Sequence, residues 1–283
     1  MQEILEILQD ALIDTVKLLP FLFLTYLIME YIEHKTSKKA RETIKKSGKF
    51  GPLIGALVGI VPQCGFSVSA TNLYAARVIT LGTLISVYLA TSDEMLPILI
   101  TEKVPIGTIL TILAIKLVIG IIAGFAIDFV IRKFKKEEQE EKIEELCEHD
   151  HCHCENGIIV SAIKHTLNIA IYILIITMVI NWVISLIGEE NIANFVSQNV
   201  VFGPVLAGIV GLVANCASSV ILTQLFVENV ISMAVLIAGL LVNAGVGLLV
   251  LFRTNKNIRE NFKIVFILYF IGVASGIILE LFL

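Results

Sequence analysis

The stretch FGPLIGALVGIVPQCGFS, residues 50–67, returns in altered form as FGPVLAGIVGLVANCASS at residues 202–219. The alignment continues without a gap, and 16 of the 40 residues at positions 50–89 are identical to the residue 152 positions later. This is more agreement than a background rich in Ile, Leu and Val should give by accident. We therefore expect two homologous halves, residues 1–134 and 158–283, joined by a linker at 135–157.

The composition indicates an integral membrane protein. Of 283 residues, 57% are hydrophobic and only 16% are charged, which is too apolar for a soluble domain with a single core. Several segments approach or exceed the ~20 apolar residues that a helix needs to cross about 30 Å of hydrocarbon. Because backbone groups in lipid must be satisfied within the segment, we expect an all-α fold.

Loop charges predict how the chain is oriented. Three loops are strongly basic, namely residues 34–49, 132–136 and 253–263, whereas residues 188–199 contain no Lys or Arg. Since Lys and Arg in short loops stay on the cytoplasmic side, the basic loops and the linker are expected inside and the N-terminus outside, in a multi-pass protein of the cell membrane. The helices predicted at 11–33 and 161–187 then run in opposite directions, so the two repeats are expected to have inverted topology.

The two apolar arms of the recurring stretch are each too short to cross a membrane. The apolar arms 51–62 and 66–77 would each reach about 18 Å as helices, enough for the midplane only. We predict a re-entrant hairpin with Gln63 and Cys64 at its tip, and a second one at 203–228 with Asn215 and Cys216 at its tip. Two tips meeting near the midplane would form one site.

Each half also contains a segment that is predicted to be a broken helix. Segment 78–100 carries the polar sequence TSDE at 91–94, and segment 230–252 carries Asn243 between apolar runs. Lys116 and Asp93 both lie roughly 24 Å from the cytoplasmic face if their segments are helical. An unpaired charge there is costly, so Lys116 is expected to pair with Asp93 or Glu94 and to couple transport to protons. In the alternative, the acids lie in the outer loop and Lys116 snorkels or is neutral.

The candidate substrate-binding residues are the polar side chains at or near these breaks. They are Gln63, Cys64, Ser67, Thr71, Asp93, Glu94, Asn215, Cys216, Ser219, Thr223 and Asn243. Thiols favour soft ions, while amide and carboxylate oxygens favour hard ones, so this ligand set does not select one metal. A membrane cysteine can also be a small core residue, and Ser or Thr can simply bond to its own helix.

The linker concentrates metal ligands. Its candidate metal-binding residues are Cys147, His149, His151, Cys152, His153 and Cys154. Imidazole and thiol groups at this density indicate a transition-metal site, although the spacing is not that of a zinc finger. The alternative is a solvated acidic linker with incidental histidines. The metal interpretation favours a metal ion as cargo.

The two FGP stretches, the TSDEMLP segment at 91–97 and the Cys/His-rich linker resemble a bacterial and archaeal family described as ten-transmembrane heavy-metal exporters. Members of this family are also labelled manganese transporters and are related to arsenical permeases. The resemblance implies efflux of a metal or metalloid. Ten membrane segments result when the four hairpin arms are counted with the six longer helices.

These observations favour a secondary-active transporter that exports a divalent heavy metal such as manganese by alternating access at the hairpin tips. The chain has no G-x-x-x-x-G-K-[ST] loop, so an ion gradient is the expected energy source. The alternative is a transporter of a small oxyanion, arsenical or organic acid, because helix N-termini at the tips favour anions. Enzymatic activity is not expected, since the sequence has neither H-E-x-x-H nor a serine with a histidine partner at membrane depth. The expected partners are a metal ion or small inorganic solute and the lipid bilayer, not nucleic acid. No cofactor is expected beyond a transported or linker-bound divalent metal ion.

Overall fold

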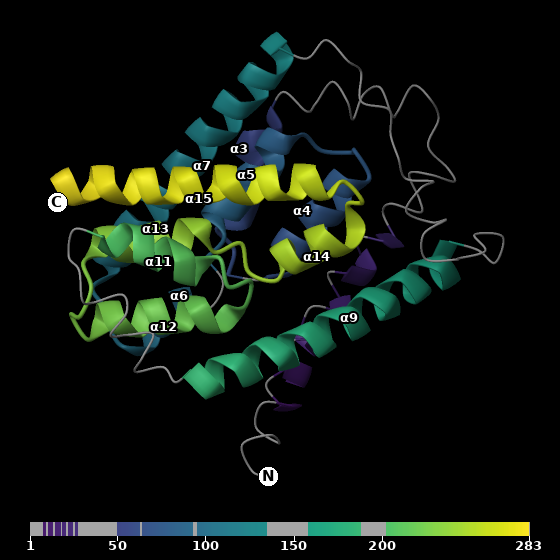
Figure 1. Ribbon diagram of the computed structural model, residues 1–283, viewed down its shortest axis with the longest axis horizontal. Coiled ribbons are helices and arrows are strands. Elements are labelled where there is room, and N and C mark those ends of the chain that lie inside the picture. Colours follow the sequence, from purple (N-terminus) through teal and green to yellow (C-terminus); the bar gives the residue numbers. More distant parts are fainter. Residues whose placement is uncertain are drawn as a thin grey trace.

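The computed structural model of the chain describes parts of residues 8–27 and then residues 50–62, 64–92, 95–134, 158–187 and 202–282 (Figure 1). The described pieces of 8–27 are helical. The labelled helices are α3 (Gly51–Gly59), α4 (Gly65–Ala75), α5 (Leu81–Ala90), α6 (Met95–Thr101), α7 (Ile106–Phe134), α9 (Ile158–Ile187), α11 (Gly203–Gly211), α12 (Cys216–Val227), α13 (Met233–Val242), α14 (Gly247–Thr254) and α15 (Ile258–Phe282). The described residues contain no strand, which confirms the all-α prediction for this part of the chain.

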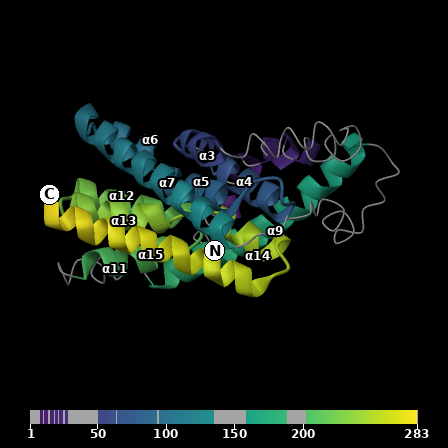
Figure 2. The same cartoon turned by 90° about the horizontal axis from the view of Figure 1, so that it is seen from above.

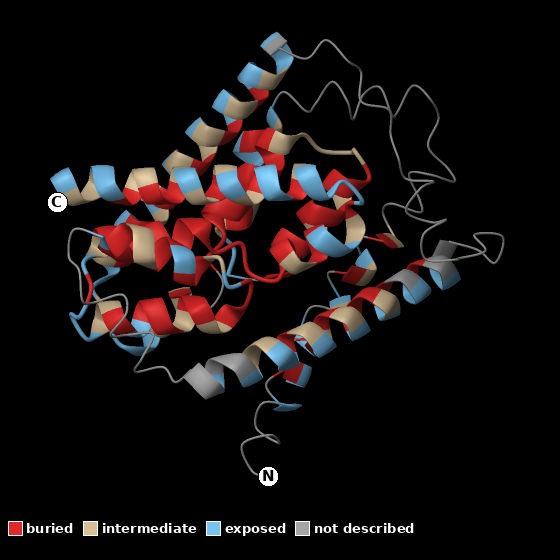
Figure 3. Ribbon diagram, in the orientation of Figure 1, coloured by how far each residue is buried: buried red, intermediate tan, exposed pale blue. Residues whose placement is uncertain are grey.

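Within the described part of the chain, five segments are long and apolar enough to cross a membrane. They are Leu81–Thr101, Ile106–Lys133, Ala162–Trp182, Met233–Thr254 and Ile258–Phe282. Burial differs among them, because the segment containing α13 is 89% buried and the one containing α15 only 22% buried. In Figure 3, α13 is accordingly almost entirely buried, while α7 and α15 each keep an exposed outer face. The prediction of a multi-pass integral membrane protein is confirmed.

The helices form two bundles of three. Helix α5 packs between α3 and α7, and helix α13 packs between α11 and α15. Figure 2 shows α3, α5 and α7 on one side of the molecule and α11, α13 and α15 on the other. The Ser86 hydroxyl holds the first bundle together by donating to the carbonyls of Pro52 on α3, at 2.5 Å, and Gly120 on α7, at 2.9 Å. Corresponding members of the two bundles are the segments that the sequence aligns 152 residues apart.

The central helices of the two bundles begin with similar caps. Thr80 caps α5 by accepting from the Thr83 N–H at 3.1 Å, and its hydroxyl donates to the Asp128 carboxylate at 2.7 Å. Ser232 caps α13 by accepting from the Val235 N–H at 3.2 Å, and it donates to the Glu280 carboxylate, also at 2.7 Å. A hydroxyl at this position satisfies an N–H group that the helix leaves unpaired.

The shorter helices connect the two bundles. Helix α4 packs against α14, and helix α12 packs against α6. Both α4 and α12 end with a left-handed residue, Arg77 at φ 60° and Asn229 at φ 59°. This ending lets the Val78 and Val230 N–H groups bond back to Leu73 and Leu225, at 2.8 and 2.9 Å. The second helix of each predicted hairpin therefore ends in the same way.

Helices stop where the sequence predicted breaks, although they are shorter than the predicted arms. Helix α3 ends at Gly59 and α4 begins at Gly65, while α11 ends at Gly211 and α12 begins at Cys216. Helix α13 ends at Val242, before α14 begins at Gly247. The re-entrant placement of these helices, their inverted topology and the domain boundaries stay predictions.

Candidate functional site

The two breaks that carry cysteine meet. Cys64 Sγ and Cys216 Sγ lie 3.2 Å apart, and the two side chains are 9% and 6% exposed. A disulfide has an S–S distance near ~2.05 Å, so both groups are thiols in this structure. Asn215 caps α12 through its side-chain oxygen, which accepts from the Cys216 N–H at 2.7 Å. The structure thus brings Cys64, Asn215 and Cys216 together.

A row of hydroxyls follows each cysteine. Ser67 donates to the Cys64 carbonyl at 2.8 Å and Thr71 donates to the Ser67 carbonyl at 2.7 Å. On α12, Ser219 donates to the Cys216 carbonyl at 2.7 Å and Thr223 to the Ser219 carbonyl at 2.6 Å. These four buried hydroxyls bond to their own helices, as the alternative interpretation expected. Within the described residues of these two helices, none of the four hydroxyls forms a hydrogen bond from α4 to α12.

Thr71 also connects α4 to the break before α14. Its hydroxyl lies 2.6 Å from the Tyr88 hydroxyl on α5, and both hydroxyls lie 3.2 Å from the Gly247 carbonyl. Tyr88 is completely buried. Sequence reasoning did not select Tyr88, since a tyrosine in an apolar segment gives no signal of what its hydroxyl contacts.

Asn243 lies in the break between α13 and α14, where a helix turn is missing. Its amide nitrogen donates to the Ser218 hydroxyl at 3.1 Å, and its amide oxygen accepts from the Gly245 N–H at 2.8 Å. Asn215 donates in addition to the side-chain oxygen of Asn181 on α9. Asn181 was not predicted, although an amide in the apolar second half of this 30-residue helix is itself a signal of a polar contact.

Asn72 is fully buried on α4, next to Thr71. Neither its amide nitrogen nor its amide oxygen has a hydrogen-bond partner within the described part of the chain. A buried amide without a partner costs about 1–3 kcal/mol. Such a group is available to water or to a passing solute.

Lys116 is fully buried in α7 and reaches both broken segments. Its ammonium group donates to the carbonyl of Thr91, directly after α5, and to the carbonyl of Leu240 in α13, the latter at 3.2 Å. Its predicted partners, Asp93 and Glu94, lie outside the described residues, as does Gln63. The pairing with a carboxylate therefore stays a prediction.

The linker ligands also lie outside the described residues. This applies to Cys147, His149, His151, Cys152, His153 and Cys154. Within the described ranges, no group of three or more His, Cys, Asp or Glu side chains could hold a metal ion.

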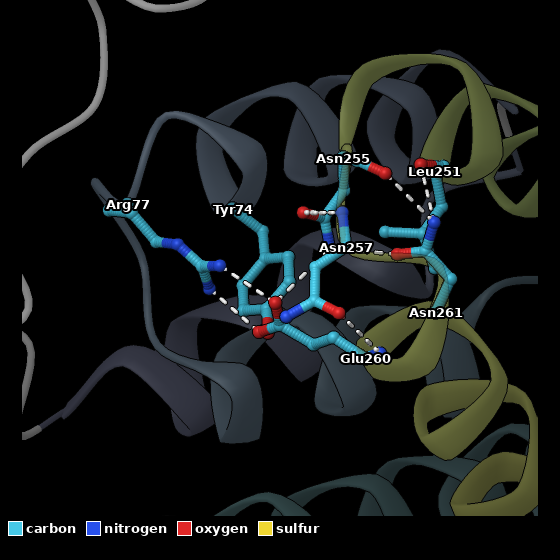
Figure 4. A network of polar contacts seen from close by, with 7 residues as sticks. All are labelled: Tyr74, Arg77, Leu251, Asn255, Asn257, Glu260 and Asn261. Atoms are coloured by element: carbon cyan, nitrogen blue, oxygen red, sulfur yellow. Dashed lines mark hydrogen bonds and ion pairs between the residues drawn. The ribbon is translucent and has the colours of Figure 1, made fainter.

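A second polar cluster closes one end of α4, beyond the hydroxyl row (Figure 4). Arg77 makes two hydrogen bonds to the Glu260 carboxylate on α15, at 2.8 and 2.7 Å, and Tyr74 donates to the same carboxylate. The Arg77 and Glu260 side chains are only 14% and 21% exposed. Hydrogen bonding to Glu260 raises the pKa of Arg77. We call Tyr74, Arg77 and Glu260 the α4–α15 clamp.

Two further contacts support the clamp from the loop between α14 and α15. Asn255 lies 3.4 Å from the Glu260 carboxylate and donates at 2.7 Å to Asn261. Asn261 in turn donates to the Asn255 carbonyl at 3.0 Å. Sequence reasoning did not select this cluster, because Arg77 and Glu260 are separated by 183 residues.

The fold and this centre define a multi-pass membrane protein with thiols, hydroxyls and amides gathered where its helices break. The sequence profile of the family described as "Putative, 10TM heavy-metal exporter" matches residues 1–186. The chain belongs to this family, and the predicted resemblance is confirmed. No curated protein and no solved structure matches the chain.

Proposed function

We propose that the chain is a secondary-active transporter that exports a divalent heavy metal across the cell membrane by alternating access. The observation that carries this proposal is the 3.2 Å contact between Cys64 Sγ and Cys216 Sγ. The contact joins equivalent positions of the two aligned stretches, and it lies where helices stop. Broken helices that point at a common centre are a frequent way to build an ion site inside a membrane protein.

The packing between the bundles supports the alternating-access part of the proposal. Each bundle is compact, whereas the contacts of α4 with α14 and of α12 with α6 run between the halves. Rocking one bundle against the other would change these cross contacts and leave each bundle intact. The α4–α15 clamp is also a contact between the halves. With the basic loops inside, the clamp lies at the cytoplasmic end and would close that entrance.

The ligand chemistry supports a heavy metal as cargo. Two thiolates and the amide oxygens of Gln63, Asn215 and Asn243 would surround an ion between the tips, with Asp93 and Glu94 as further oxygen ligands. Thiolate–metal distances of about 2.3 Å require the two sulfurs to separate when a metal enters. Manganese is the example that the family suggests, and the thiol pair would increase the preference for softer ions such as Zn²⁺ and Cd²⁺.

The remaining residues take supporting roles in the proposal. Asp93, Glu94 and Lys116 couple export to a proton gradient, since Lys116 touches both broken segments. The Cys/His-rich linker captures metal on the cytoplasmic side before it reaches the tips.

A transporter of arsenicals or other small oxyanions is the second candidate. The thiol pair also favours this cargo, because trivalent arsenic is a soft centre, and α12 begins with its N-terminus at Cys216. The two candidates differ in the charge of the cargo.

The test is uptake into proteoliposomes of Mn²⁺, Cd²⁺ or arsenite, each in turn. Wild type is compared with Cys64→Ala and Cys216→Ala, and the control carries Cys147, Cys152 and Cys154 changed to Ala together. We expect metal uptake to fall at least tenfold in each tip variant, about 1.4 kcal/mol, and to fall less in the control, because the linker assists metal capture but does not form the tip site. Uptake of arsenite alone would favour the second candidate. Full metal uptake by both tip variants would refute the tip site.

A further inference from the structure

An apolar groove runs along the exposed face of α15, away from the thiol centre. The groove has a volume of about 590 Å³, and it lies between α15 and the end of α11. Its apolar lining includes Leu212, Phe262, Val265, Phe266 and Tyr269. Phe262 and Phe266 are 62% and 68% exposed. The volume is within the range of small-ligand sites, about 300–1,000 Å³.

The groove exists because α11 is much shorter than α15. The two helices are in contact from Gly276, where an added Cβ would lie 3.1 Å from Pro204, to Tyr269, whose hydroxyl donates to the Val205 carbonyl at 3.2 Å. Helix α11 ends at Gly211, so it leaves the part of α15 before Tyr269 uncovered. Figures 1 and 2 both show α15 extending past the end of α11.

The uncovered part has the length of one membrane leaflet. From Arg259 to Tyr269 a helix rises about 15 Å, half of the ~30 Å hydrocarbon core. Arg259, the first residue of this stretch, lies next to the basic loop. If Gly211 and the cysteine-bearing tip are at the midplane, then Tyr269, the last residue, lies near the level of the thiol centre. The groove is therefore long enough to hold an acyl chain of a lipid in one leaflet.

Two cations lie at the end of the groove that is away from α11. Arg259 and Lys263 both line it, both are exposed, and they are one helix turn apart on the same face. Among the described residues neither forms an ion pair. Two uncompensated cations above an apolar groove complement an anionic headgroup with attached acyl chains.

We propose that this groove binds one anionic phospholipid of the cytoplasmic leaflet. Arg259 and Lys263 hold its headgroup phosphate, and one acyl chain lies along Phe262 and Phe266. The inference goes beyond the transport proposal and uses only its orientation, in which residues 253–263 are cytoplasmic. The bound lipid fills the space that the short helix α11 leaves beside α15.

The test uses the full chain in detergent, and native mass spectrometry measures binding of added dioleoyl phosphatidylglycerol or dioleoyl phosphatidylcholine. We expect wild type to bind the anionic lipid about 25-fold more tightly, because each of two cations contributes about a factor of five. The double variant Arg259→Gln and Lys263→Gln should lose this preference. Lys256→Gln removes an exposed cation outside the groove and should keep it.

A second variant tests the apolar part. Leu212→Trp narrows the groove without changing charge, and we expect weaker binding of both lipids. The proposal is wrong if wild type does not distinguish the two lipids, or if the double variant binds phosphatidylglycerol as wild type does. It is also wrong if the groove is occupied by a second copy of the chain, seen as a dimer that Leu212→Trp dissociates. None of these readouts requires transport, so the lipid site and the transport function can fail separately.

Discussion

The sulfur atoms of Cys64 and Cys216 touch at 3.2 Å, although 152 residues separate them in the chain. One belongs to the turn between α3 and α4, the other begins α12, and both side chains are buried. The contact therefore connects the two halves of the chain at the point where α4 and α12 begin. A reduction of the S–S distance by about 1 Å would allow a covalent bond.

An oxidant is expected to crosslink the two halves at this point. The test protein has Cys147, Cys152 and Cys154 replaced by Ser and a protease site inserted in the linker 135–157. After oxidation and cleavage, the halves should migrate together on a non-reducing gel and separate on a reducing one. Cys64→Ser in the same background should abolish the crosslink. Halves that separate after oxidation under both conditions would show that the two sulfurs do not meet.

Breaking the α4–α15 clamp is expected to destabilise the protein. Arg77→Ala and Glu260→Ala should each lower the free energy of unfolding by about 1–3 kcal/mol, less than for a fully buried pair because both groups keep some solvent contact. Tyr74→Phe removes one hydrogen bond and leaves the ion pair, so its expected effect is about 1 kcal/mol. Thermal unfolding in detergent measures all three. If the three variants lowered the free energy of unfolding equally, the ion pair would not be the main contribution of the clamp to stability.

The clamp variants also test the proposed entrance. If the clamp closes the cytoplasmic side, Arg77→Ala should speed the alkylation of Cys64 by a membrane-impermeant maleimide in inside-out vesicles. The linker cysteines are replaced here too. An unchanged alkylation rate, with the destabilisation still present, would make the clamp a structural contact only.

The contact between the two tips could be predicted from the sequence because the two halves repeat the same segments and are therefore expected to fold alike. The same Cys occurs at the same position of both stretches, and apolar arms of about 12 residues can reach only the midplane. Symmetry then brings the two tips together without any knowledge of individual contacts. The helix breaks that begin at Thr91 and at Asn243 could be predicted for a similar reason, since polar residues interrupt apolar runs there.

Contacts between individual side chains could not be predicted in this way. Asn181 reaches Asn215 and Arg77 reaches Glu260 through the relative placement of helices, which a repeat does not specify. The counterpart of Arg77 is Asn229, so the clamp occurs in only one of the two related places. The alignment of the halves shows that Arg77 and Asn229 differ, but it does not indicate which residue Arg77 contacts.

Replacing Asn72 is expected to separate stability from transport. Asn72→Leu removes a buried amide that has no described partner, so the free energy of unfolding should rise by about 1–2 kcal/mol. If the amide contacts the passing ion, the uptake of Cd²⁺ should fall in the same variant. The control is Gln224→Leu, at the corresponding exposed position of α12. A lower thermal unfolding temperature for Asn72→Leu would indicate that the amide is satisfied in the folded protein.

Lys116→Met tests proton coupling. The change keeps the side-chain length and removes the charge that contacts Thr91 and Leu240. We expect a folded protein whose transport no longer depends on pH, measured as uptake between pH 5.5 and 8. Lys133→Met, at an exposed position in the last turn of the same helix, should keep the wild-type pH profile. A wild-type profile in Lys116→Met would exclude Lys116 from the coupling.

Two glycines of α7 provide a matched test of the packing between α5 and α7. A Cβ at Gly124 would lie 2.7 Å from the Gly82 carbonyl and 2.8 Å from the Pro52 side chain, whereas a Cβ at Gly107 meets nothing within 4 Å. Gly124→Ala should therefore lower the free energy of unfolding by about 1–3 kcal/mol, because the helices must move apart. Gly107→Ala should raise it by up to about 1 kcal/mol, because Ala favours the helix. Thermal unfolding of the two variants should shift in opposite directions, and a shift in the same direction would mean that α7 does not pack on α5 as closely as described.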